Sequence, residues 1–218
     1  FPTAGGDAEE IERFLMMKVL DPLIAAGKIK VYSCDSVAGR VFFSKEGSPE
    51  HRMWVMNQYH QYVKHEVVPA IRTDCQDPEI LVWSAGASIG AFHAAAMVCR
   101  FPDLFQKAIC MSGTYNLLRF CERKEPTEDY FVSSPLHFLP TLAGPHLELL
   151  RQRHLLLASG RGRWEDINES WKLAAALGHQ GVSNYVDDWG PEVHHDWITW
   201  RDMLPKFLGE WTKDQEPG

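Results

Sequence analysis

The stretch WSAGASIGAFHAAA, residues 83–96, places Ser88 between Gly86 and Gly90. The apolar run EILVWSAG is typical of a buried parallel strand, and the alanine-rich run after the serine predicts a helix. A serine in such a tight strand-to-helix turn needs small residues two positions away on either side, because larger side chains would collide. The pattern therefore predicts a nucleophile elbow, with an ordinary N-cap serine in a close-packed turn as the alternative.

Strands and helices alternate through almost the whole chain. Short apolar or alternating runs predict strands, and amphipathic or alanine-rich runs predict helices. This alternation favours an α/β fold, a mainly parallel sheet with helices on both faces, in a single domain over residues 1–218. The predicted strands cover residues 28–36, 79–86, 107–113, 154–160 and 183–190, and the predicted helices cover residues 7–27, 48–72, 87–101, 168–181 and 194–211.

The composition argues against several classes of function. A net charge of −7 disfavours nucleic acid as a partner, and no run of about 18 apolar residues marks a membrane span. The five cysteines are scattered without C-x-x-C spacing, which favours free thiols in a reducing compartment over a disulfide framework or a zinc site. We therefore expect a cytoplasmic protein that binds neither nucleic acid nor membranes.

The opening residues, FPTAGGDAEE, contain neither an initiator Met nor a signal-peptide pattern. They are typical of a strand end that runs into a glycine-rich loop. We expect the native protein to have further residues upstream, which leaves a signal peptide open.

A nucleophilic serine needs a histidine base, and on a fold of this kind the histidine follows the last strand. The segment DDWGPEVHHDW offers His194 and His195 between the predicted strand at residues 183–190 and the last helix. Spacing alone does not separate the two histidines.

The base needs a carboxylate, which should follow the strand at residues 154–160. Glu165 and Asp166 are both available there, and either one could instead be a solvated loop charge or a helix cap. Asp187 and Asp188 are a third choice, but they lie within the next predicted strand, where a structural role is favoured.

The oxyanion of an acyl-transfer intermediate needs backbone N–H donors. The residue after the nucleophile, Ile89, supplies one at the start of a helix. On topological grounds the second donor comes from the loop FPTAGGD, where Thr3 and Ala4 are the candidates.

With these pieces the sequence resembles the α/β-hydrolase superfamily, and more closely a bacterial group of predicted esterases related to esterase D. The resemblance implies an α/β-hydrolase fold with Ser88 as nucleophile, His195 as base and the FPTAGG loop as part of the oxyanion hole. It also implies strands ahead of that loop, so we expect the first strands of the fold to be absent from this chain. The resemblance covers nearly the whole chain. The segments that carry it are FPTAGGD, YHQYVKHEVVPAIR, GASIGAFHA, FPDLFQKAICMSGTYN and HDWITWRDMLPKFL.

Two positions depart from the pattern of that group. Ala91 stands where a second glycine is frequent after the elbow, which a single methyl group should allow. Arg163 stands where related esterases often have an aspartate, so we take Glu165 as the triad acid and keep Asp166 as the alternative.

The resulting hypothesis is a serine carboxylic-ester hydrolase that acts on a small-molecule ester through an acyl-enzyme, with no metal or organic cofactor. A thioesterase or an acyltransferase would use the same residues, and a non-catalytic binding protein on the same fold is a further alternative. Residues 122–146 form an irregular stretch that could serve as a partial lid. The sequence leaves the oligomeric state open.

Overall fold

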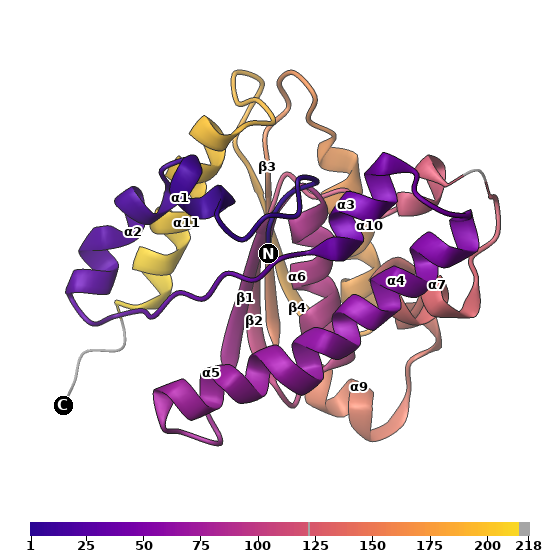
Figure 1. Ribbon diagram of the computed structural model, residues 1–218, viewed down its shortest axis with the longest axis horizontal. Coiled ribbons are helices and arrows are strands. Elements are labelled where there is room, and N and C mark those ends of the chain that lie inside the picture. The colour runs from indigo at the N-terminus through magenta and orange to yellow at the C-terminus, as the bar shows by residue number, and fades with distance from the viewer. Residues whose placement is uncertain (122, 214–218) are drawn as a thin grey trace.

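A four-stranded parallel sheet forms the centre of the molecule (Figure 1). The computed structural model describes residues 1–121 and 123–213. The strand order is β1-β2-β3-β4, and each strand is hydrogen-bonded to the next in the sequence. The carboxyl ends of all four strands therefore meet at one edge of the sheet. The strands are β1 (Val82–Ala87), β2 (Phe105–Met111), β3 (His154–Ser159) and β4 (Ser183–Asp188).

Helices cover both faces of the sheet, as the alternation in the sequence predicts (Figure 1). Along β2, Ile109 packs toward α2 (Met16–Ala25) and α11 (Trp197–Trp211), whereas Cys110 packs on the opposite face. Successive side chains of a strand point to opposite faces, so the buried run of β2 contributes to two separate cores. The opposite core is formed with α3 (Val37–Ser44), α4 (Pro49–Tyr62), α6 (Ile89–Arg100) and α10 (Ile167–His179).

The long helix predicted over residues 48–72 is present with one irregularity. The α4 helix passes through a π-helical turn at Val63–Val67 into α5 (Val68–Cys75). Met53 and Met56, which the periodicity places on the core face, are fully buried. The predicted face of this helix is thus the buried one, and the helix contacts α6 through the aromatic residues Tyr59 and His60 against His93.

Two expectations near the N-terminus are wrong. Residues 28–36 form no strand, because they run in extended conformation without a backbone ladder to a neighbour. The single helix expected over residues 7–27 is two helices, α1 (Glu10–Arg13) and α2, since Leu15 adopts a left-handed conformation with φ of 61° that interrupts the helix between them.

The stretch predicted as a partial lid is largely helical and packs away from Ser88. Its helices are α7 (Glu128–Ser133), α8 (Pro135–Phe138) and α9 (Gly144–Leu150), with a 3₁₀ turn at Leu139–Thr141; residue 122 lies outside the described residues. The α7 helix packs on α4, and Ser133 contacts Arg100 at the far end of α6. The 12 residues of α6 span roughly 18 Å, so α7 covers the end opposite to the elbow.

Of the helices in the described ranges, none is both long and apolar enough to cross a membrane.

Candidate active site

Ser88 forms a strained turn between β1 and α6. Its φ of 58° and ψ of −122° lie in a region that residues with a side chain rarely adopt. A Cβ atom on Gly86 would lie 2.2 Å from the carbonyl oxygen of Gly90, and a Cβ on Gly90 would lie 2.6 Å from the carbonyl oxygen of Phe1. Both positions of the G-x-S-x-G pattern therefore need glycine, for the steric reason that the sequence suggests.

The opening loop and the residue after the serine meet at α3. A Cβ on Gly39 would lie 3.1 Å from the carbonyl oxygen of Thr3 and 3.6 Å from Cγ2 of Ile89. Ile89 is the first residue of α6, so its N–H has no acceptor within the helix. The predicted oxyanion loop thus lies beside the predicted first donor.

The two candidates in this loop differ in what their N–H groups do. The N–H of Thr3 donates to Oε2 of Glu10 at 2.8 Å, and the Thr3 hydroxyl donates to the same oxygen at 2.9 Å. Thr3 is therefore a poor oxyanion donor in this geometry, a correction to the sequence prediction. Within residues 1–121 and 123–213, the N–H of Ala4 has no acceptor, which leaves Ala4 as the candidate of this loop.

Glu165 lies in the loop after β3, and its side chain is only 1% exposed. Ser112 Oγ–H donates to its Oε1 at 2.5 Å, and Ser159 Oγ–H donates to its Oε2 at 3.1 Å. Nδ1 of His195 lies 3.6 Å from Oε2, slightly beyond hydrogen-bond length. The structure therefore brings together the carboxylate and the histidine that the sequence pairs.

The alternative carboxylates are occupied elsewhere. Asp166 is the N-cap of α10, since its Oδ1 accepts the N–H of Asn168 at 3.2 Å, and its side chain is 43% exposed. Asp166 thus caps α10 from the position just before its first residue, Ile167. Asp187 pairs with Lys206 at 3.1 Å, and Asp188 pairs with Arg161 at 3.1 Å.

The two neighbouring histidines point in different directions. Nδ1 of His194 accepts the backbone N–H of Arg163 at 3.0 Å, which holds this ring against the loop after β3. The backbone N–H of His195 donates to the carbonyl oxygen of Arg163 at 3.1 Å, and its ring packs edge-on against Trp200 at 5.1 Å. Nδ1 of His195 faces Glu165. The two histidines therefore have different partners, Glu165 for His195 and the backbone of Arg163 for His194.

Three residues around the carboxylate were not foreseen. Ser112 directly follows the buried strand β2, and Ser159 ends the buried strand β3. A glycine comes after each serine, and this pattern is visible in the sequence. Both belong to the edge of the sheet where Ser88 lies. Trp200 belongs to α11, and its indole N–H donates to Ser112 Oγ at 2.9 Å. Its helical periodicity predicts burial but not this hydrogen bond.

Comparison with known proteins places the chain in a family. The family model named Esterase, described as "Putative esterase", matches residues 34–207. The chain belongs to this esterase family. The protein is a carboxylic-ester hydrolase. No curated protein sequence matches the esterase significantly.

Solved structures similar to the esterase share the α/β-hydrolase fold. The fluorophosphonate-binding serine hydrolase F of Staphylococcus aureus, with substrate bound, has a TM-score of 0.61 at 14% identity and covers 98% of this chain and 82% of its own. A ferulic acid esterase has a TM-score of 0.59 at 17% identity, with 95% and 81% covered. The S-formylglutathione hydrolase of Staphylococcus aureus has a TM-score of 0.55 at 14% identity, with 97% and 79% covered. At these identities the likeness shows the fold alone.

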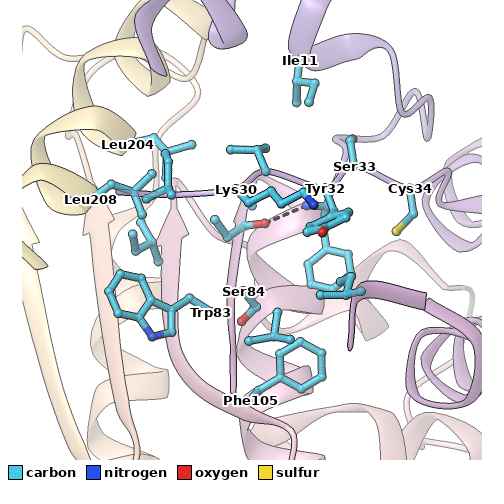
Figure 2. Close-up of a pocket in the computed structure, with 18 of the residues that line it drawn as sticks. Ile11, Lys30, Tyr32, Ser33, Cys34, Trp83, Ser84, Phe105, Leu204 and Leu208 are labelled. Atoms are coloured by element: carbon cyan, nitrogen blue, oxygen red, sulfur yellow. Dashed lines mark hydrogen bonds between the residues drawn. The ribbon is translucent and has the colours of Figure 1, made fainter. Parts of the chain in front are cut away.

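A cavity lies along the free edge of β1 (Figure 2). It has a volume of about 500 Å³ and is mainly apolar, with Trp83, Phe105 and Leu204 in its lining. Ser88, Glu165 and His195 are not part of the lining. Thr3 of the opening loop and Gly86 before the elbow do line the cavity, which therefore extends to the carboxyl end of β1. In the described ranges, no group of three or more His, Cys, Asp or Glu residues could hold a metal ion.

Proposed function

We propose that the esterase hydrolyses small-molecule carboxylic esters through an acyl-enzyme on Ser88, with His195 as the general base and Glu165 as the carboxylate that orients it. The main support is the approach of Glu165 to Nδ1 of His195 at 3.6 Å. The three side chains come from the ends of β1, β3 and β4, which meet at one edge of the sheet. This is the order of nucleophile, acid and histidine that an α/β-hydrolase uses.

The reaction follows from these positions. Ser88 Oγ attacks the ester carbonyl carbon while Nε2 of His195 takes the hydroxyl proton, and the carbonyl oxygen becomes an oxyanion. The N–H groups of Ile89 and Ala4 are the proposed donors to this oxyanion. The intermediate collapses when His195 returns the proton to the leaving alcohol. A water molecule then attacks the acyl group with the same base, which releases the carboxylic acid and restores the Ser88 hydroxyl.

Glu165 acts on the charged form of His195. Imidazolium forms at each tetrahedral intermediate, and a carboxylate beside Nδ1 stabilises that charge and fixes the tautomer. A distance of 3.6 Å is long for a hydrogen bond, but hydrogen bonds of this kind are often long without substrate and shorten in the complex. The mechanism uses neither a metal nor an organic cofactor.

A set of p-nitrophenyl esters of increasing acyl length tests the proposal. We expect turnover by the wild type and at least 10³-fold less by Ser88→Ala, because the nucleophile is lost. Ser183→Ala is the matched control, since this exposed serine begins β4 at the opposite edge of the sheet. A fluorophosphonate probe followed by peptide mapping should modify Ser88.

Equal turnover by wild type and Ser88→Ala, together with no labelling of Ser88, would contradict the proposal. Thioesters and alcohol acceptors belong in the same panel, because a thioesterase or an acyltransferase would use the same nucleophile and base. The ratio of turnover numbers then assigns the preferred acyl acceptor and leaving group.

A further inference from the structure

We propose that Ser112 and Trp200 are positioning residues that hold the Glu165 carboxylate in place for His195. The inference rests on the proposed function, in which Glu165 orients the base. It concerns two residues outside the three that carry out the chemistry. Their contacts form a continuous chain of hydrogen bonds from α11 through the end of β2 to the carboxylate.

The direction of each hydrogen bond in this chain is fixed by chemistry. The indole N–H of Trp200 is only a donor, so Ser112 Oγ must accept at their distance of 2.9 Å. The single proton of the Ser112 hydroxyl is then directed to Oε1 of Glu165, 2.5 Å away. A hydroxyl that both accepts and donates in this way cannot rotate without losing a bond, so it is a fixed donor.

This fixed donor sets the orientation of the Glu165 carboxylate relative to the base. Oε1 is engaged by Ser112, whereas Oε2 is shared by Ser159 at 3.1 Å and His195 at 3.6 Å. The side chain of Glu165 is 1% exposed, so water cannot replace either hydroxyl as a donor. Rotation of the carboxylate about its last bond by a quarter turn would break the contact with Ser112, because neither oxygen would then face the hydroxyl. The serine therefore holds Oε2 toward His195.

The backbone of Ser112 is itself held in position. Its φ of 49° lies in the left-handed region, and its N–H donates to the carbonyl oxygen of Ala158 at 2.7 Å. The loop that follows is tied by Glu169, whose Oε2 accepts the N–H groups of Tyr115 and Asn116, both at 2.9 Å. Backbone strain of this kind persists where the surroundings impose it, and it is often found at functional sites.

Trp200 also contacts the base directly. Its ring lies edge-on to the ring of His195, with centroids 5.1 Å apart and an interplanar angle of 84°. The side chain is 4% exposed and packs among the residues of α11 and the sheet. One rigid side chain thus touches the base with its ring and reaches the acid through Ser112.

Three variants separate these roles. Ser112→Ala removes the donor to Glu165, Trp200→Phe keeps an aromatic ring but removes the indole N–H, and Ser112→Gly removes the donor at a φ that glycine adopts freely. Trp211→Phe is the matched control, because Trp211 lies on the same helix, partly buried, and its indole N–H has no acceptor within the described residues.

We expect kcat to fall roughly 10- to 100-fold in Ser112→Ala, the range for the loss of a hydrogen bond to a buried charged group. In Trp200→Phe we expect kcat to fall roughly 3- to 10-fold, and KM should change by less than about twofold in each variant. Because Trp200 acts on the acid through Ser112, the double variant should be no slower than Ser112→Ala alone. Ser112→Gly should lose activity without a lower Tm, and Trp211→Phe should behave as wild type.

The pKa of His195 gives a readout that does not depend on turnover. It is measured by NMR titration of the imidazole signals, assigned with His195→Gln. A displaced carboxylate stabilises imidazolium less, so the titration should separate Ser112→Ala and Trp200→Phe, in which the imidazole signals titrate at lower pH than in the wild type, from Trp211→Phe, in which they do not. The low-pH limb of the kcat/KM profile should move in the same direction.

The two proposals fail in different ways. Without Ser88-dependent turnover in the wild type, the proposed function fails, while a lower pKa of His195 in the two variants would still support the positioning role. An unchanged pKa of His195 in folded Ser112→Ala and Ser112→Gly would overturn the positioning role, whatever the turnover of the wild type. Additive losses in the double variant would equally overturn the chain from Trp200 through Ser112.

Discussion

Replacing Glu165 by glutamine should lower kcat strongly and leave the fold nearly unchanged. The substitution keeps the shape of the side chain but removes the negative charge 3.6 Å from Nδ1 of His195. Two unit charges at that distance interact by about 4.6 kcal/mol at an effective dielectric constant of about 20. At 1.36 kcal/mol per factor of ten, this corresponds to a loss of roughly 10³-fold in kcat for Glu165→Gln.

The assay is steady-state hydrolysis of p-nitrophenyl acetate at pH 7.5, with Tm measured on the same samples. Asp166→Asn is the matched control, because it changes the neighbouring carboxylate that caps α10. We expect this control to keep its kcat and to lose at most about 1 kcal/mol of stability through the weaker cap. If Glu165→Gln keeps kcat within tenfold while Asp166→Asn loses it, the carboxylate has been assigned to the wrong residue.

Three further predictions concern the elbow and the core. Gly86→Ala should lower Tm by at least several degrees, because its Cβ would lie 2.2 Å from the carbonyl oxygen of Gly90; an unchanged melting curve would contradict this packing. Ser88→Gly should abolish turnover yet raise Tm by about 2–4 °C. The glycine relieves a backbone strain of about 1–3 kcal/mol, and the greater entropy of the unfolded chain offsets part of this gain. A Tm below that of the wild type would show that the backbone of Ser88 is not strained. Burial lowers the pKa of His93 to about 3 and that of His60 well below its ordinary value. Below about pH 6.5 the unfolded chain therefore binds more protons at these histidines than the folded chain does. The free energy of unfolding consequently falls as the pH falls. Urea unfolding at pH 5 should show about 2 kcal/mol less stability per histidine than at pH 7, and an equal stability at both values would contradict neutral burial.

The pair of buried histidines links α6 to α4. Nε2 of His60 and Nδ1 of His93 lie 2.9 Å apart, and the guanidinium of Arg100 donates to Nδ1 of His60 at 2.7 Å. His60 must then donate from Nε2, so both rings are neutral with defined tautomers. The network runs along α6 from His93, about one turn after Ser88, to Arg100 at the far end, and it joins this helix to α4. The histidines here are structural.

Much of the fold could be predicted from the sequence because its signals are local. The buried runs of β1, β2 and β3 and the periodic faces of α4 and α11 each lie within a window of about twenty residues. The expected strand over residues 28–36 failed for the opposite reason. Ile29 and Val31 alternate toward the apolar core as a strand would, but a strand also requires a neighbouring ladder, which no pattern within the segment reports.

The elbow could be predicted for the same local reason, and the oxyanion donor less well. Steric demands fix Gly86 and Gly90 within five residues of sequence. The choice between Thr3 and Ala4 depends on Glu10, whose carboxylate takes the N–H of Thr3. A side-chain acceptor seven residues away has no signature in the loop itself.

The choice between Glu165 and Asp166 depends on one backbone angle. Trp164, the residue before them, adopts a φ of 68° in a turn closed by the Glu165 N–H and the carbonyl oxygen of Gly162, and its side chain is 80% exposed. The turn directs Glu165 inward to Ser112 and leaves Asp166 at the start of α10. Tryptophan is not a residue that favours the left-handed region, so the sequence gives no sign of the turn. A strained turn therefore places the proposed acid, Glu165, just as a strained turn presents the proposed nucleophile, Ser88.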